Sequence, residues 1–236
     1  MRLDSGIRVT WLGHSTFRIA YEDRTLLIDP WVMSNPVCPD DAGRFENIDV
    51  MLITHGHSDH IADAVALGRE FQPTVAANFE IIAWLEARGI EHSEPMNKGG
   101  TIDVDGLQVT MTHAFHSSTI TDEDGNTVPA GEAGGFVVRF PNGFAIYHAG
   151  DTAVFGDMKL IGELYAPDLA MLPIGSRFTM DPREAALAVR LVGAPAVIPI
   201  HYGTFPLLTG TPDEFQQLTA DDPVEIIVLH PGETLE

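Results

Sequence analysis

The chain has 236 residues, of which 44% are hydrophobic, so it can bury one substantial core and we expect a single domain over residues 1–236. Its 34 acidic residues against 13 basic ones give a formal net charge of −21. Because a phosphate backbone is held mainly by clustered Lys and Arg, this balance disfavours nucleic acid as a substrate or partner, although a local basic pocket stays open.

Two further classes of protein are disfavoured. No stretch approaches the ~20 consecutive apolar residues of a membrane-spanning helix. Residues 1–6 lack the apolar core of a signal peptide, so we expect a cytoplasmic protein without a membrane partner. The single cysteine, Cys38, excludes an intramolecular disulfide, and no neighbouring cation would activate its thiol.

The first part of the chain is expected to consist mainly of short strands. Alternation and β-branched residues predict strands over residues 7–11, 16–21, 25–29 and 49–53. Asn78 is expected to cap a helix that runs to Arg88 and stops at Gly89. The turn dipeptide Asp105-Gly106 predicts a hairpin of residues 101–104 and 107–112.

The middle of the chain contains a weak internal repeat. An exposed acidic loop is expected over residues 121–127. The hairpin predicted over residues 135–140 and 143–148 is similar in composition to residues 17–28, and both end in polar residues. This similarity suggests two related halves, each of which supplies loops to a shared site.

Helices and strands alternate in the last third of the chain. Asp181 is expected to cap a helix that has Pro182 at its first position and stops at Gly193. Thr211 carries the same capping signature for a helix to Leu218, and strands are predicted over residues 195–200 and 224–229. The order of elements predicts an α/β fold in which helices cover the sheets.

The most informative segment is Thr54-His55-Gly56-His57-Ser58-Asp59-His60, which follows an apolar strand. It places four potential metal ligands in six residues, although histidine makes up only 10 residues of the whole chain. Imidazole and carboxylate groups are ligands of zinc and similar divalent ions. A solvated polar loop is the alternative, and the further clusters at strand ends argue against it.

Three other segments place potential ligands where a predicted strand ends. They are Phe115-His116-Ser117-Ser118, Tyr147-His148-Ala149-Gly150-Asp151-Thr152 and Pro199-Ile200-His201-Tyr202-Gly203. Ligands recur at such strand ends in α/β folds, because the loops meet at one edge of the sheet.

Together these segments resemble the metallo-β-lactamase superfamily, and the resemblance covers nearly the whole chain. The H-x-H-x-D-H pattern is highly specific for the superfamily. The chain looks more narrowly like the UlaG-like branch of metal-dependent hydrolases, on less specific runs: Trp11-Leu12-Gly13-His14-Ser15, Leu27-Ile28-Asp29-Pro30, Tyr147–Thr152, Pro173-Ile174-Gly175 with Phe178-Thr179-Met180, and Pro199–Pro206.

The resemblance implies a four-layer αββα sandwich with a two-metal site where the two sheets meet. Carried over by position, His55, His57 and His116 would hold one ion. Asp59, His60 and His201 would hold the second ion, and Asp151 would bridge the two. Zinc is the expected cofactor, and manganese or iron would accept the same donors.

The implied activity is hydrolysis by a metal-bridging hydroxide, with Asp59 and Asp151 as the catalytic carboxylates. The substrate would be a small molecule with an ester, lactone, amide or phosphoester bond. A metal-binding or sensor protein that keeps the fold without hydrolysis is the alternative. The sequence leaves open both the substrate and whether the chain forms a homo-oligomer.

Several neighbouring residues have two interpretations. His113 competes with His116 as the ligand that follows the predicted strand 107–112. His14, His148 and Tyr202 could line the site or support its ligands, and each could equally be structural. Asp29 could orient a ligand histidine or form a local turn.

One departure from the branch pattern lies after Pro173-Ile174-Gly175. The branch continues there with Asp, whereas this chain has Ser176, which puts a supporting or substrate-binding role of that position in doubt. Arg177 beside it could bind an anionic group of the substrate, or it could be an ordinary exposed arginine.

Overall fold

Two seven-stranded mixed β-sheets form the centre of the molecule in the computed structural model, which describes residues 6–122 and 124–236. Residues 1–5, which belong to the segment compared with a signal peptide, and position 123 of the predicted acidic loop lie outside the described part.

The first sheet has the strand order β16-β1-β2-β3-β4-β5-β6. Neighbours from β16 to β3 are antiparallel and those from β3 to β6 are parallel. Its strands are β1 (Ile7–Gly13), β2 (Thr16–Tyr21), β3 (Arg24–Ile28), β4 (Val50–Leu52), β5 (Thr74–Asn78), β6 (Ser93–Met96) and β16 (Thr234–Leu235).

The second sheet has the order β15-β14-β13-β12-β11-β8-β7 and is parallel from β12 to β15. Its strands are β7 (Thr101–Val104), β8 (Leu107–His113), β11 (Gly134–Arg139), β12 (Ala145–His148), β13 (Leu169–Pro173), β14 (Ala196–Ile200) and β15 (Glu225–Ile226). A separate hairpin pairs β9 (Thr119–Thr121) with β10 (Thr127–Pro129).

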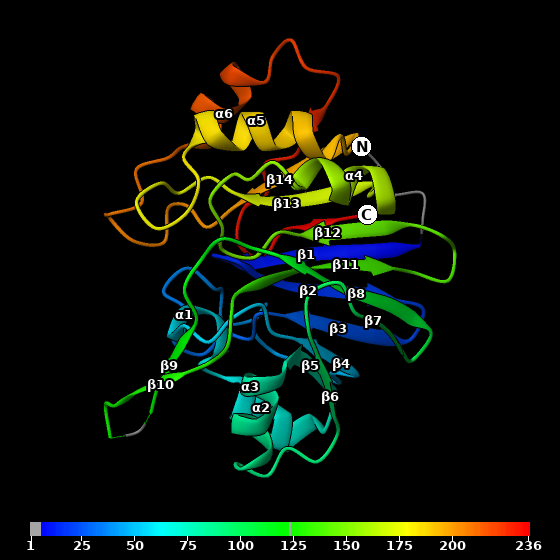
Figure 1. The fold of residues 1–236 in the computed structure, drawn as a ribbon, viewed down its shortest axis with the longest axis vertical. Helices are drawn as coiled ribbons and strands as arrows, with labels where there is room; N and C mark the ends of the chain where they lie inside the picture. Colours follow the sequence, from blue (N-terminus) through cyan, green and yellow to red (C-terminus); the bar gives the residue numbers. More distant parts are fainter. Residues whose placement is uncertain (1–5, 123) are drawn as a thin grey trace.

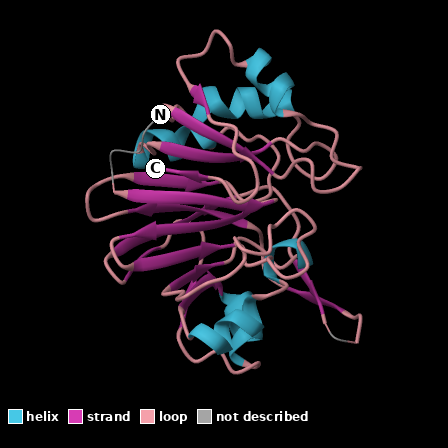
Figure 2. Ribbon diagram, turned by 180° about the vertical axis from the view of Figure 1, so that it is seen from behind, coloured by secondary structure: helices cyan, strands magenta, loops and turns pink. Residues whose placement is uncertain are grey.

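Helices lie beyond both sheets along the long axis of the molecule, with α4, α5 and α6 at one end and α2 and α3 at the other (Figure 1). Figure 2 shows the same arrangement from behind, with the strands between the helices. The helices are α1 (Ser58–Ile61), α2 (Ala64–Phe71), α3 (Phe79–Glu86), α4 (Met158–Tyr165), α5 (Pro182–Val192) and α6 (Pro212–Leu218). In the described residues, no helix is long and apolar enough to cross a membrane.

Three buried apolar clusters occupy the spaces between four layers. One joins the facing sides of the two sheets and includes Phe17 and Phe136. A second packs α4, α5 and α6 against the second sheet, and a third packs α1, α2 and α3 against the first. The predicted four-layer αββα sandwich is therefore confirmed.

The predicted helix caps are confirmed. Asp181 Oδ1 accepts a hydrogen bond from the Glu184 amide at 2.8 Å, and Thr211 Oγ1 accepts one from the Glu214 amide at 3.3 Å. Asn78 Oδ1 accepts one from the Ile81 amide at 2.9 Å. Each bond satisfies an amide that has no partner within its own helix.

Some elements differ from the prediction. The last strand was expected over residues 224–229, but β15 spans only Glu225–Ile226, which pair with Ala196 and Val197 of β14. The expected acidic loop is the tip of a hairpin, since residues 119–121 and 127–129 pair as strands. The elements that were not predicted are α1, α2, α4, β5, β6, β9, β10, β13 and β16.

The core between the sheets generates a first prediction. Phe136 is fully buried there, so Phe136→Ala should lower the free energy of unfolding by about 3–5 kcal/mol through lost contacts and a residual cavity. Leu164→Ala is the control, because that side chain is 70% exposed and its loss should cost less than about 0.5 kcal/mol. Urea denaturation of both variants measures the difference, and equal midpoints would contradict the assigned core.

Candidate metal centre

Loops at the carboxyl ends of strands from both sheets bring the predicted ligands together. His55 and His57 follow β4, and His60 lies in the short helix α1 directly after them. His116 follows β8, and Asp151 and His201 follow the parallel strands β12 and β14. Residues that are far apart in the sequence therefore converge where the two sheets meet.

Three histidines form the first group, with one ring nitrogen of each within 4.8 Å of the others. His55 Nε2 lies 3.0 Å from His57 Nδ1, and His116 Nε2 lies 3.3 Å from the same His57 atom. Two nitrogens that bind one tetrahedral zinc ion are separated by ~3.3 Å, so this spacing fits such an ion.

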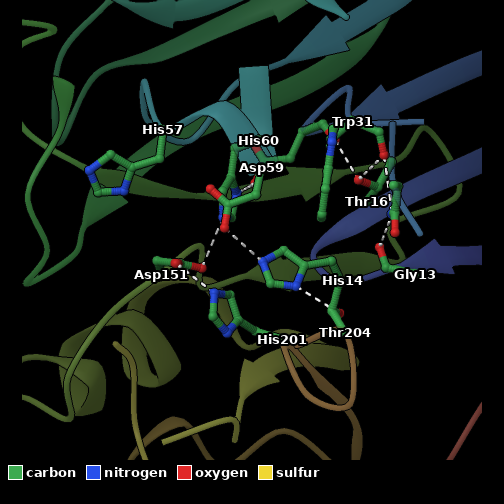
Figure 3. Close-up of polar contacts among 12 residues, drawn as sticks. Gly13, His14, Thr16, Trp31, His57, Asp59, His60, Asp151, His201 and Thr204 are labelled. Carbon is green, nitrogen blue, oxygen red and sulfur yellow. Dashed lines mark hydrogen bonds and ion pairs between the residues drawn. The ribbon is translucent and has the colours of Figure 1, made fainter. Parts of the chain in front are cut away.

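Asp151 joins the second set of ligands to the first. Its Oδ2 lies 2.9 Å from His201 Nε2 and 3.7 Å from His116 Nε2, and its Oδ1 lies 3.3 Å from His60 Nε2. Asp151 is 2% exposed, so both oxygens are enclosed by imidazoles of the two groups. Figure 3 shows Asp59, His60, His201 and Asp151 directed toward one another, with His57 further away.

The buried side chains of Thr54 and Asp29 orient the imidazoles of His55 and His60. Asp29 Oδ2 accepts a hydrogen bond from His60 Nδ1 at 2.8 Å, which leaves His60 Nε2 to face Asp151. The Thr54 hydroxyl donates to Asp29 Oδ2 at 2.7 Å and lies 3.0 Å from His55 Nδ1, from which it can accept a hydrogen bond. Of the two interpretations of Asp29, the orienting one is found. The role of Thr54, directly before the motif, was missed.

His14 lies closer to the ligands than its sequence position suggested. Its Nε2 is 3.2 Å from Asp59 Oδ2, and it belongs to a group with Asp59, His60 and His201 whose ligand atoms lie within 4.8 Å. Its other nitrogen, Nδ1, contacts the Thr204 hydroxyl at 2.9 Å (Figure 3). His14 is therefore part of the cluster.

The histidines differ in their protonation. Burial lowers the pKa of His14 to about 4, and burial also lowers the pKa of His55, His57 and His116. Burial alone would lower the pKa of His60, but the carboxylates of Asp151 and Asp29 outweigh it and raise this pKa well above 6.5. At neutral pH the first four imidazoles are neutral, as metal ligands must be, whereas His60 holds a proton in the metal-free protein.

The two carboxylates of the cluster stay ionised. Burial raises the pKa of Asp151, but His201 and His60 outweigh it and hold the pKa well below its usual range. Burial also raises the pKa of Asp59. The hydrogen bond with His14 and the charge of His60 outweigh this effect, so the pKa of Asp59 lies below its usual range as well.

The backbone is strained at three residues of the site. His14, Asp29 and His201 have φ values of 56°, 51° and 55°, in the left-handed region that costs a residue with a side chain about 1–2 kcal/mol. All three are buried at strand ends, and the His201 amide donates to the His14 carbonyl at 3.0 Å. Such strain persists where surrounding contacts over-determine the conformation.

The remaining candidates lie outside the cluster. His148 Nε2 donates to the Ser15 carbonyl at 2.9 Å and its Nδ1 accepts from the Gly150 amide at 3.1 Å, so both nitrogens hold the backbone. His113 Nδ1 contacts Lys98 Nζ at 3.1 Å, whereas His116 Nε2 lies 3.3 Å from His57 Nδ1. Of the two histidines, His116 is therefore the one that lies in the group with His55 and His57. The Tyr202 ring stacks on Trp11 with centroids 5.2 Å apart.

The loop after β13 contains Ser176, which stands where the UlaG-like branch has Asp, and its neighbour Arg177. Ser176 and Arg177 both have positive φ, and the Ser176 amide donates to the Met180 carbonyl at 2.9 Å. Arg177 is exposed, and its guanidinium lies 5.6 Å from the centre of the Phe178 ring. Neither side chain joins the described groups of potential ligands.

The site fits a bound metal on a further observation. Among the described residues, the buried atoms His60 Nε2, Asp151 Oδ1 and His201 Nδ1 have no hydrogen-bond partner. The first two lie 3.3 Å apart without the alignment of a hydrogen bond. Unpaired polar atoms are costly in a protein interior, and a divalent cation would satisfy the facing nitrogen and oxygen.

Comparisons with known proteins agree with this geometry. The family model described as a beta-lactamase superfamily domain matches residues 24–202. A UPF0173 metal-dependent hydrolase of Rubrobacter xylanophilus is 54% identical over 233 residues, which cover 98% of this chain and 96% of that protein. A second UPF0173 metal-dependent hydrolase, from Koribacter versatilis, is 51% identical over 233 residues, with 97% of each chain covered.

A solved structure is similar over the same length. It is Igni18, described as a novel metallo hydrolase from Ignicoccus hospitalis, with a TM-score of 0.85 and 37% sequence identity. The similarity covers 97% of this chain and 97% of that one.

A close backbone contact beside His201 generates the second prediction. A Cβ atom at Gly175 would overlap the His201 carbonyl oxygen, so Gly175→Ala should displace this histidine, lower the free energy of unfolding by about 1–3 kcal/mol and reduce the metal that the protein retains. Gly156→Ala is the control, because nothing lies within 4 Å of its added Cβ. Urea denaturation and elemental analysis measure both effects, and wild-type values for Gly175→Ala would refute the contact.

Proposed function

This chain belongs to the beta-lactamase superfamily and to its UPF0173 metal-dependent hydrolases, and we propose that it cleaves a small-molecule substrate with two divalent ions. The bond would be an ester, lactone, amide or phosphoester. The observation that carries the proposal is the Asp151 carboxylate, one oxygen of which faces His60 while the other faces His201 and His116.

We propose the following ligands. His55, His57 and His116 hold one ion, and Asp59, His60 and His201 hold the other, with Asp151 between them. The convergence of the nitrogens of the first group on His57 Nδ1 and the unpaired His60 Nε2 support this division. Zinc is the proposed metal because of the imidazole-rich donor set.

The carboxylates of the chain would support the chemistry that bound ions supply. When bound, a pair of divalent ions acts as a Lewis acid and brings the pKa of a water molecule toward neutrality. Asp151 and Asp59 remain ionised and supply the negative charge that keeps such cations in place. Asp59 is 27% exposed at its side chain, so substrate and water can reach its carboxylate.

His14 and Asp29 act through the residues that they contact. His14 is buried and neutral, and its contact with Asp59 Oδ2 fixes the direction in which this carboxylate points. Asp29 holds the His60 ring by its Nδ1 and so presents Nε2. A carboxylate behind a ligand histidine is a common support of metal sites, and its loss typically weakens metal binding or activity 10- to 100-fold.

The third prediction tests the metal-dependent reaction. His57→Ala removes the nitrogen toward which both His55 and His116 point, so the protein should lose metal and all hydrolysis of a panel of esters, lactones, amides and phosphoesters. His92→Ala alters an exposed histidine outside the site and should keep wild-type metal content and activity. Elemental analysis of protein purified without added metal, followed by the substrate panel, gives the result. Activity retained by His57→Ala would exclude the proposed mechanism.

The fourth prediction follows from the proton on His60. Because two carboxylates raise its pKa, zinc binding to the metal-free protein at pH 7 should release about one proton from this residue. Zinc affinity should fall between pH 7 and pH 5, because the ion must displace the proton on His60 and this proton competes more strongly as the pH falls. Calorimetry in buffers of different ionisation enthalpy counts the protons.

Asp29→Asn removes one of the two carboxylates, so His60 should be less protonated and fewer protons should be released. Asp40→Asn, at an exposed position, is the control and should release the same number as the wild type. Equal proton release by Asp29→Asn and the wild type would show that Asp29 does not hold the proton on His60.

A further inference from the structure

Part of the outer face of the first sheet carries polar side chains instead of a helix. On β1 and β2, residues Ile7, Val9, Phe17 and Ile19 point into the core between the sheets, so alternate residues point outward. The outward positions include Arg8, Thr10, Arg18 and Ala20, and these line a surface cavity of about 440 Å³. A cavity of this size can hold a small-molecule ligand.

Two arginines and two threonines form the floor of this cavity. Thr10 is paired with Arg18 on β2 and with Thr234 on β16, and Arg8 is two residues from Thr10 on the same strand. The Thr10 and Thr234 hydroxyls lie 2.9 Å apart. The floor thus offers guanidinium and hydroxyl groups, and the carboxylate of Glu236, two residues beyond Thr234, also lines the cavity.

Neither arginine of the floor has an ion-pair partner among the described residues. Within residues 6–122 and 124–236, no ion pair involves Arg8, Arg18 or Arg44, which also lines the cavity. Arg18 donates only to the carbonyl oxygens of Ala42 and Arg44, at 3.3 and 3.4 Å. Burial lowers the pKa of Arg18 and the charge of Arg8 lowers it further, so the two guanidinium groups lie close enough to repel each other.

A fourth lining arginine serves the fold instead. Arg24 pairs with Asp105, at 3.2 Å from its carboxylate and 2.8 Å from its carbonyl oxygen. Of the four arginines that line the cavity, Arg8, Arg18 and Arg44 are therefore the ones available to bind an anion.

We propose that this cavity is a second ligand site, which binds the phosphate group of a small molecule. Arginine is suited to this because its planar fork donates two parallel hydrogen bonds to a phosphate. An anion between Arg8 and Arg18 relieves their mutual repulsion, and whichever of the Thr10 and Thr234 hydroxyls accepts their mutual hydrogen bond can donate its own proton to the anion. The ligand is either a phosphomonoester or free phosphate, since both present the same group.

The rim of the cavity sets the kind of anion that fits. Glu22, Asp23, Glu46 and Glu236 are exposed acidic residues that also line it, in a chain with a net charge of −21. Exposed charges are screened over about 8–10 Å at moderate ionic strength, so they weaken the attraction of the floor only in part. They do repel a long polyanion, which would have to cross the rim, and so favour a compact phosphate over nucleic acid.

The cavity is separate from the metal centre but shares a chain segment with it. None of its lining residues belongs to the groups of potential metal ligands found among the described residues. Trp31 contacts the His14 ring with centroids 5.2 Å apart, and residues 44–47, further along the same segment, line the cavity.

Titration calorimetry of the metal-loaded protein with inorganic phosphate and with phenyl phosphate tests the proposal. Saturable binding is expected, and Arg8→Gln should weaken it by about tenfold or more, because a charge-assisted hydrogen bond is lost from an exposed side chain that holds nothing else. Arg183→Gln, an exposed arginine on α5, is the matched control and should bind as the wild type does.

His57→Ala separates the cavity from the metal centre and also prevents turnover of phenyl phosphate. Binding that persists in His57→Ala and is weakened by Arg8→Gln supports the proposal, and the tighter of the two probes identifies the source of the phosphate group. Absence of saturable binding at millimolar concentrations overturns it, as does binding that is lost in His57→Ala and unchanged in Arg8→Gln. Because hydrolysis plays no part in this readout, failure here leaves the proposed hydrolase function intact.

Discussion

The fully buried contact between Asp29 and His60 is the interaction on which the site depends. Asp29 follows β3, His60 lies in α1, and Asp151 on the other side of His60 follows β12 of the second sheet. One imidazole is thus held between carboxylates from two sheets. Charged groups such as these are costly to bury. The Thr54 amide and hydroxyl offset part of that cost by donating hydrogen bonds to the Asp29 carboxylate. The position of the ligand turn relative to both sheets follows from this chain of contacts.

Much of the fold was predictable because its signals are local. The caps at Asn78, Asp181 and Thr211 act within four residues. In β1 and β2, apolar residues recur at every second position because one side of each strand faces the core between the sheets. β13 (Leu169–Pro173) escaped prediction although it is buried on both faces in the same way as β14, which was predicted. Its membership in the second sheet follows from parallel pairing with β12 and β14, and distant pairing of this kind leaves no local pattern.

For the site, the sequence indicated the expected ligands and offered Asp29 as a support of one of them, but it did not indicate the supporting role of Thr54. The seven residues expected from the superfamily resemblance converge in space, and the narrower UlaG-like resemblance stays a prediction. His14 and Thr204 lie 190 positions apart, and their contact has no sequence pattern that could have revealed it. The left-handed backbone of His14, Asp29 and His201 was equally hidden, because no glycine or asparagine stands there to signal it.

The pairing of β16 with β1 has a consequence for the behaviour of this protein in concentrated solution. β1 is a seven-residue strand with six buried residues, and on its outer side it would be an open edge able to recruit a strand of another molecule. Thr234 and Leu235 pair with it, and the Gly232 amide donates to the Trp11 carbonyl at 2.7 Å. A short returning segment thereby occupies the hydrogen-bonding groups along which aggregation would otherwise begin.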